Sequence, residues 1–279
     1  MSPYVVCIGL ATVDTIFRVP RHPGPDDRVV ASEVVVAGGG PAATAAVTLA
    51  RLAVRAFFVG AVGDDDAGTE IRAGLEREGV DVSHLAVVAG ARSASSTILV
   101  GAGTRAIVTV PGPPVALRED ALELCRGAAW VHVDHAGYAA APRDVRLSID
   151  GGNPIPDLDL CGVALYAPTE QALDEAFRGG LRQALAAGAE VVVGTKGANG
   201  CIAATRDGEH HEVSGLHGDV VSTLGAGDVF HGALLAQLVG GSALDRALVA
   251  ATRCAFLSCR ALDGRSAIPT ADELDEVAA

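Results

Sequence analysis

Short apolar strand runs alternate with helical stretches along most of the chain, and this alternation constrains the fold more than any other feature. The first two runs, YVVCIGL (4–10) and AFFVGAVG (56–63), have the composition of fully buried strands. Further strands are predicted at 130–135, 145–150, 162–167 and 190–195, and a helix is predicted from Ala243 to about Leu262. Strands that alternate with helices favour an α/β fold, with a central, mostly parallel sheet covered on both faces.

Two strand-rich stretches, near 15–37 and 93–111, interrupt this rhythm. The second resembles a hairpin with GAGT as its turn. We expect the two stretches to pair as a small second sheet, placed as a β lid over the strand ends. The α/β domain would then comprise residues 1–14, 38–92 and 112–279.

Composition narrows the class of partner and the compartment. The chain has 279 residues, of which 49% are hydrophobic, and a formal net charge of −13. Such a charge argues against nucleic acid or an anionic membrane as a partner. No run is long enough to span a bilayer, and the six cysteines form no C-x-x-C pair. The start of the sequence does not resemble a signal peptide. We therefore expect a cytoplasmic protein with reduced thiols.

The stretch STLGAGDVFHGALLAQL (222–238) places small residues and one acid in front of an apolar helix. The N-terminus of a helix presents unpaired N–H groups and partial positive charge. With Gly225, Ala226 and Gly227 there, a phosphate could approach the main chain closely. The carboxylate of Asp228 would be repelled by that phosphate. It could instead accept the proton of a hydroxyl that attacks the phosphate. Taken alone, however, the stretch also fits an ordinary turn followed by a core helix.

Three other segments combine a strand end with glycines or an acid. VVVAGGGPAATAAVTLARL (34–52) has the pattern strand, glycines, helix, and Asp14 follows the first buried strand. VGTKGANG (193–200) ends a strand in Thr195, Lys196 and Gly197. Each segment fits a ligand contact at the carboxyl end of a sheet, and each also fits a turn or a cap.

Together these motifs resemble the ribokinase family of sugar kinases, also called the PfkB family. The two family signatures occur in order as AGGGPAATAAVTLARL and STLGAGDVFHGALL, and the resemblance covers nearly the whole chain. VGDDDAG (62–68) and LDGRSAIPT (262–270) also match regions typical of the family. Within it, the motifs are most similar to the branch containing sulfofructose kinase and ketohexokinase-like enzymes.

The resemblance implies a three-layer α/β/α domain with a β lid, and transfer of the γ-phosphate of ATP to a sugar hydroxyl with Mg²⁺. Asp228 matches the position of the base. Family members often pair through their lids, so a homodimer is implied. The implied anion hole is Gly225, Ala226 and Gly227; the implied sugar-binding residues are Asp14, Gly38, Gly39 and Gly40; the implied ATP-binding residues are Thr195, Lys196, Gly197 and Gly200.

Two departures from the family pattern concern cations. Many relatives begin the second signature with Asp-Thr, where this chain has Ser222-Thr223. That Asp often helps to build a monovalent-cation site, so K⁺ activation stays open. Many relatives also carry Asn-x-x-Glu, where this chain keeps Glu170 but has Ala167. We expect Mg²⁺ to be held mainly by phosphates and water, with Glu170 contributing through water.

Other departures concern the acceptor. Ala43 stands where many relatives hold the sugar with Asn, which disfavours furanose recognition of the ribokinase type. A sulfonate or phosphate on the acceptor would need a basic partner, for which Arg28 is a candidate and Arg105 a weaker one. His135, at a strand end, could reach the sugar. His132, Asp134 and His135 also have the ligand types of a metal site.

The leading hypothesis is a ketose-type or modified-sugar kinase. A nucleoside or other small-alcohol kinase of the same fold is an alternative, although aromatic residues to stack a base are few. A regulatory module that binds a sugar or nucleotide without catalysis is another, but binding alone needs no base. An oxidoreductase is disfavoured because GLATVD lacks the G-x-G-x-x-G pattern.

Overall fold

A nine-stranded sheet forms the centre of the protein in a computed structural model that describes residues 2–276. Its strand order is β13-β12-β11-β10-β9-β8-β1-β4-β5, and every pair is parallel except β11–β12 and β12–β13. The predicted parallel sheet is therefore confirmed. Its strands are β1 (Tyr4–Ile8), β4 (Arg55–Gly63), β5 (Leu85–Val88), β8 (Trp130–Val133), β9 (Leu147–Gly151), β10 (Leu165–Pro168), β11 (Val191–Thr195), β12 (Cys201–Thr205) and β13 (His210–Val213).

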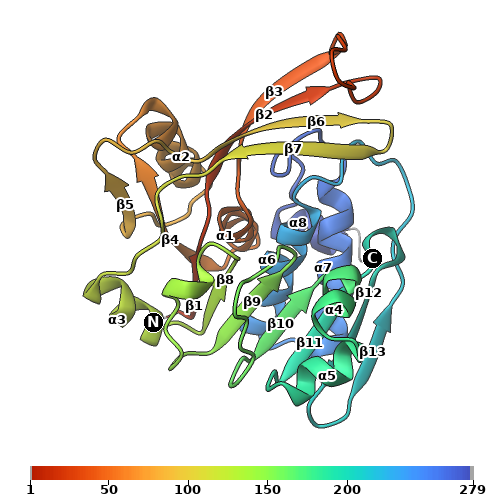
Figure 1. Cartoon of the computed structure of the whole chain (residues 1–279). Helices are drawn as coiled ribbons and strands as arrows, with labels where there is room; N and C mark the ends of the chain where they lie inside the picture. Colours follow the sequence, from red (N-terminus) through yellow and green to blue (C-terminus); the bar gives the residue numbers. More distant parts are fainter. Residues whose placement is uncertain (1, 277–279) are drawn as a thin grey trace.

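Helices cover both faces of this sheet, as the alternating pattern predicts (Figure 1). One apolar core joins the sheet to α1 (Pro41–Arg51), α2 (Asp66–Arg77), α6 (Ala226–Val239) and α7 (Leu244–Ser258). A second core, on the opposite face, holds α3 (Glu119–Arg126), α4 (Glu170–Ala176) and α5 (Gly180–Ala186). The predicted three layers are thus present.

A separate four-stranded sheet, the lid, has the order β3-β2-β6-β7 and projects beyond one end of the large sheet (Figure 1). Its strands are β2 (Thr12–Arg18), β3 (Glu33–Gly39), β6 (Ser95–Gly101) and β7 (Thr104–Val110). The predicted hairpin is the β6–β7 pair. The strands begin earlier and end later than the stretch 15–37, so the lid sheet includes Asp14 and Gly38.

Pairing within the lid gives it two distinct faces. Asp14, Ser96 and Thr109 are paired across β2, β6 and β7 and therefore share one face, which also carries the small apolar cluster of Ile16 and Ile98. The alternate positions form the other face, which carries the exposed valines Val34, Val36, Val108 and Val110.

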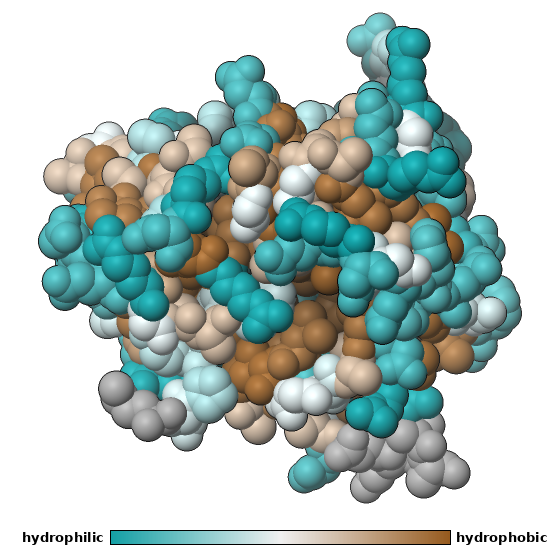
Figure 2. Space-filling model, turned by 90° about the horizontal axis from the view of Figure 1, so that it is seen from below, coloured by the Kyte–Doolittle hydropathy of each residue, from teal (hydrophilic) through white to brown (hydrophobic). Residues whose placement is uncertain are grey.

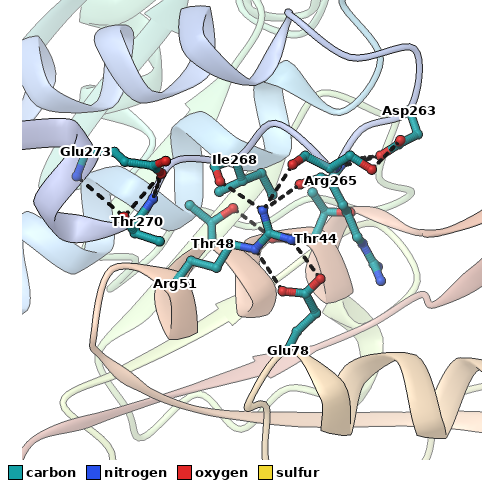
Figure 3. Close-up of polar contacts among 10 residues, drawn as sticks. Thr44, Thr48, Arg51, Glu78, Asp263, Arg265, Ile268, Thr270 and Glu273 are labelled. Atoms are coloured by element: carbon teal, nitrogen blue, oxygen red, sulfur yellow. Dashed lines mark hydrogen bonds and ion pairs between the residues drawn. The ribbon is translucent and has the colours of Figure 1, made fainter. Parts of the chain in front are cut away.

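The C-terminal segment departs from the sequence-based expectation. A helix was expected to extend from 243 to 262, but α7 ends at Ser258 and a loop follows as far as the short α8 (Ala271–Glu276). Arg51, the last residue of α1, fixes this loop (Figure 3). Its guanidinium donates to the carbonyl oxygens of Arg265 at 2.9 Å and Ile268 at 2.8 Å, and forms a two-pronged ion pair with Glu78 at 2.7 Å.

The end of the large sheet opposite the lid is hollowed. Figure 2 looks onto the protein from below and shows apolar surface gathered between hydrophilic side chains. A cavity of about 650 Å³ there is lined by Trp130, Leu165 and Leu238, with Arg146 and Arg206 among its polar residues. Across residues 2–276, no helix is both long and apolar enough to cross a membrane.

Candidate active site

A cavity of about 790 Å³ lies between the lid and the carboxyl ends of the central strands. Its walls include lid residues such as Asp14 and Thr109, the glycines 38–40, and the loops that follow β9, β10 and β11. The N-terminus of α6, with Asp228, lies on the same cavity. The structure therefore brings together the two glycine motifs, which are almost 190 positions apart in the sequence.

Gly225 starts α6 in a conformation that favours glycine. Its φ of 73° and ψ of −4° are left-handed, and a Cβ there would lie 3.0 Å from the Cα of Gly264. No side chain caps this helix end. The bare main chain predicted in front of the apolar helix is therefore present.

The N–H groups at this helix end are not all free. The N–H of Ala226 donates to the carbonyl oxygen of Thr223 at 3.3 Å. Within the described part of the chain, no acceptor faces the N–H groups of Gly225, Gly227 or Asp228. The donors available to an anion thus differ from the expected set, with Asp228 in place of Ala226.

Asp228 lies in the first turn of α6 and is only partly exposed, at the wall of the cavity. Burial raises the pKa of its carboxyl to about 8, with a further increase from the negative charge of Asp150 and a decrease from His231. A pKa near neutrality is well matched to a group that accepts a proton at physiological pH.

The lid end of the cavity contains buried polar atoms without a partner. Thr12 Oγ1, Asp14 Oδ1 and His135 Nδ1 are all buried and have no hydrogen-bond partner among residues 2–276, and all three residues line the cavity. Burial raises the pKa of Asp14, opposed by Thr12, Ser96 and Arg265. Buried polar groups normally have partners. This end of the cavity is therefore suited to a polyhydroxy ligand.

Arg265 and Asp14 occupy the space where side chains on Gly38 and Gly39 would lie. The Arg265 guanidinium donates to the carbonyl oxygen of Gly39 at 2.7 Å and to Thr44 Oγ1 at 3.1 Å. A Cβ on Gly38 would meet Arg265 Nη1 at 2.3 Å, and one on Gly39 would meet the Asp14 carboxylate at 1.9 Å. The glycines thus admit two charged side chains to the edge of the cavity. Burial lowers the pKa of Arg265 to about 10, against the opposing effect of Asp14, so it remains a cation at neutral pH.

The opposite end of the cavity is formed around β11. Thr195, Gly197 and Gly200, three of the residues implied for ATP binding, line it. Lys196 does not line it, because its ammonium forms an ion pair with Glu212 on β13 at 2.8 Å. Glu170, exposed in the first turn of α4, follows the cavity residue Thr169 without lining the cavity itself.

The two lid arginines are placed differently. Arg28 is exposed in the segment between β2 and β3 and does not line the cavity. Arg105, on β7, does line it and donates to Thr223 Oγ1 at 3.1 Å. The weaker of the two sequence candidates is therefore the one that reaches the cavity.

The set His132, Asp134 and His135 does not form the metal site considered from the sequence. Both carboxylate oxygens of Asp134 accept main-chain hydrogen bonds, from Leu10 at 2.8 Å, Ala42 at 3.1 Å, Ala136 at 2.9 Å and Gly137 at 3.0 Å. Asp134 therefore holds the start of α1 against the end of β1. It is a structural residue, and this is the reason why an acid stands at the end of β8.

A different group, His132, Asp150 and His231, lies buried below Asp228 with its ligand-type atoms within 4.8 Å of one another. His231 Nδ1 lies 3.2 Å from Asp150 Oδ2, and His231 Nε2 lies 3.0 Å from the carbonyl oxygen of Ala167. His132 Nδ1 contacts Ser148 Oγ at 3.1 Å, and burial lowers the pKa of this histidine to about 3, so it is neutral. Protein contacts therefore account for both nitrogens of His231.

Sequence reasoning missed Arg265, Asp150 and His231. Arg265 falls in a segment that matched the family as a whole, and its partner Gly39 is 226 positions away. His231 was hidden in an apolar helix, where its spacing of three residues from Asp228 was the only available signal.

Comparisons with known proteins agree with this geometry. The family described as pfkB family carbohydrate kinase matches residues 2–145 and 170–271. The chain is 30% identical over 284 residues to an ATP-dependent ribose-1-phosphate kinase of Halopiger xanaduensis, covering 96% of this chain and 95% of that protein. It is 30% identical to an aminoimidazole riboside kinase of Salmonella typhimurium, with coverage of 85% and 86%.

The fold also matches solved structures. Ribokinase of Arabidopsis thaliana, solved in complex with ribose and ATP, superposes with a TM-score of 0.85 at 23% identity, covering 99% of each chain. At that identity the likeness concerns the fold, and it includes both the large sheet and the lid.

Proposed function

The chain belongs to the pfkB family of carbohydrate kinases, and from that premise we propose that it transfers the γ-phosphate of ATP to a hydroxyl of a ketose-type or modified sugar, with Asp228 as the base. The observation that carries this proposal is the position of Asp228. It stands where a helix end with free N–H groups meets a pocket of unpaired polar atoms.

The acceptor binds at the lid end of the cavity. Thr12 Oγ1, Asp14 Oδ1 and His135 Nδ1 hydrogen-bond its hydroxyls, which satisfies three buried atoms that otherwise lack partners. Ala43 is fully buried in α1 and offers no amide to a sugar, which supports an acceptor other than a ribokinase-type furanose. Arg105 is the basic side chain placed to contact an anionic substituent.

ATP binds at the β11 end, with its phosphates directed to α6. Main-chain atoms near Thr195, Gly197 and Gly200 contact the nucleotide, while Lys196 stays paired with Glu212. Mg²⁺ would neutralise charge on the phosphates. Asp150, the carboxylate at the end of β9, is paired with His231, so the ion would be held mainly by phosphates and water. Glu170, in the first turn of α4 just outside the cavity, would contribute through water.

Transfer occurs in line. Binding of the acceptor closes the lid and excludes water, which limits hydrolysis of ATP. Asp228 orients the attacking hydroxyl and accepts its proton late, when the phosphoryl group has largely left ADP. The free N–H groups of Gly225, Gly227 and Asp228 stabilise the charge on the group in transfer.

The exposed lid face supports a homodimer. Val34, Val36, Val108 and Val110 are 58%, 63%, 71% and 48% exposed and occupy one face of the sheet. Exposed apolar side chains gathered on one face of a sheet fit an interaction site. We assign the protein to the cytoplasm, where ATP is available and its six unpaired cysteines stay reduced.

A panel of acceptors tests the function. Ketoses, aldoses, sugar phosphates, sulfonated sugars and nucleosides are incubated with Mg²⁺ and ATP, and ADP release is followed. We expect release that depends on a sugar and that disappears in Asp228→Asn, which excludes a contaminating kinase. Release with nucleosides alone would assign the nucleoside-kinase alternative. Ligand binding without release by any acceptor would favour the regulatory module.

A further inference from the structure

One buried group is not used by the mechanism above: the pair of His231 and Asp150, placed below Asp228. His231 follows Asp228 by three residues on α6, so the two side chains project from the same side of the helix. Asp150 ends β9, and both residues of the pair line the floor of the cavity while being 5% and 3% exposed.

The contacts of His231 fix its protonation state. Nε2 faces the carbonyl oxygen of Ala167 at 3.0 Å, and a carbonyl oxygen only accepts, so Nε2 carries a proton. Nδ1 faces Asp150 Oδ2 at 3.2 Å, an ion-pair distance although the hydrogen bond is not well aligned. Asp150 is stabilised as a carboxylate by the N–H of Gly152 at 2.7 Å. Both ring nitrogens thus face acceptors, which describes an imidazolium.

We propose that His231, held as an imidazolium by Asp150 and the Ala167 carbonyl, is a positioning residue that stabilises the carboxylate form of Asp228, the form that accepts the acceptor's proton. This inference rests on the proposed function, because it concerns the same base. It adds to the site a fixed positive charge on α6, one helical turn after Asp228.

The surrounding charges agree with this role. Asp150 raises the pKa of His231 against the effect of burial, and Asp228 acts in the same direction. The pKa of Asp150 is lowered to about 2, with His231 as the main favourable cause against burial. Asp228 also faces Asp134, which raises its pKa, and Arg265, which lowers it. Without His231, the carboxyl of Asp228 would face two buried acids with Arg265 as the remaining opposing charge.

His132 provides a matched control. It lies beside His231, with ring centroids 5.6 Å apart, and is equally buried, but it is neutral and contacts Ser148. The variant His231→Gln keeps a donor for the Ala167 carbonyl and removes the charge. The variant His132→Asn keeps a donor for Ser148 and changes the packing of the same cluster, yet it removes no charge.

The first test needs no activity. In protein labelled with ¹⁵N-histidine, the ring nitrogens of His231, assigned by their loss in His231→Gln, should both be protonated between pH 6 and pH 8. A neutral tautomer at pH 7 would overturn the inference, whether or not the protein is a sugar kinase.

The second test measures Asp228 itself. The ¹³C carboxyl resonance of Asp228, assigned by its loss in Asp228→Asn, should titrate at higher pH in His231→Gln by about one pH unit or more. This is the shift expected when a unit charge one helical turn away is removed at an effective dielectric constant of about 20. The acid limb of the pH profile of kcat/KM should shift by the same amount as the titration of Asp228. His132→Asn should leave the titration of Asp228 unchanged. Equal shifts in both variants would indicate a packing effect and overturn the inference.

Discussion

At the scale of single residues, the proposed chemistry depends on Asp228. A positioned base contributes about 10² to 10⁴ in rate. The variant Asp228→Asn preserves size and position but cannot accept the proton, so we expect kcat to fall at least a hundredfold while the far-ultraviolet circular dichroism stays unchanged. Steady-state assays with the identified acceptor check this. Turnover near that of the wild type would remove Asp228 from the role of base.

The same residue makes a prediction about stability. Its pKa is about 8 in the folded protein against an ordinary value of 3.8, so the folded state binds the proton more tightly than the unfolded chain does. The favourable contribution of the Asp228 carboxyl to the free energy of unfolding is therefore fully present below about pH 4 and is lost as the pH rises to 8. Asp228→Asn should stabilise the protein, and more so at pH 9 than at pH 5.

Urea unfolding at the two pH values measures this difference. Asp174→Asn, an exposed substitution on α4, serves as the control and should show the same small effect at both. A gain for Asp228→Asn that does not increase with pH would contradict a raised pKa.

Single residues also show where sequence reasoning ends. Asp14, Asp228 and the glycines could be found because strand ends, helix starts and small residues leave local patterns. Arg265 leaves none, because its role arises from a contact with Gly39, which is far away in the sequence. Asp150 ends a predicted strand, but its pairing with His231 could not be inferred from that position. Arg28 and Arg105 are alike in the sequence, and only the geometry of the lid distinguishes them.

At the scale of elements, the N-terminus of α6 can be tested with two glycines. Gly227 has φ in the helical region and no atom within 4 Å of a built Cβ, so Gly227→Ala should keep or raise the stability of the helix, by up to about 1 kcal/mol. The methyl group introduced by this substitution would nevertheless restrict the approach of a phosphate to the free N–H groups. We expect a lower kcat/KM for ATP together with an unchanged or higher Tm.

Gly225→Ala is the contrasting variant. Its left-handed φ and the nearby Gly264 Cα should cost about 1–2 kcal/mol of stability as well as activity. Thermal melts and ATP titrations of both variants separate the two effects. A Gly227→Ala enzyme with normal kinetics would show that phosphate does not approach this turn.

Strong local patterns made most elements predictable. The buried strands β1 and β4 and the helix α1 were placed within a few residues, since apolar runs and Pro41 mark them. The four-residue β5 and six-residue α8 were missed, because so few residues show no periodicity. The end of α7 was misplaced because the apolar sequence continues, while Arg51 holds the following loop by its carbonyl groups.

At the scale of the whole molecule, the apolar lid face predicts self-association. Val36→Asp and Val108→Asp place charges at the two most exposed of the four valines on this face. Either variant should convert a dimer to a monomer, measured by light scattering coupled to gel filtration. Val249→Asp, at a residue 46% exposed on α7 outside the lid, should leave the dimer intact. A monomeric wild type, or dissociation by Val249→Asp, would contradict the assignment.

The division of the cavity between two sheets has a consequence for altering the enzyme. The proposed nucleotide contacts come from loops of the large sheet, while Asp14, Ser96, Arg105 and Thr109 line the cavity from the lid. Chimeras that exchange the lid strands between relatives would therefore graft a new choice of sugar onto an unaltered phosphate donor site, and this separation gives one scaffold a route to diversify its substrates.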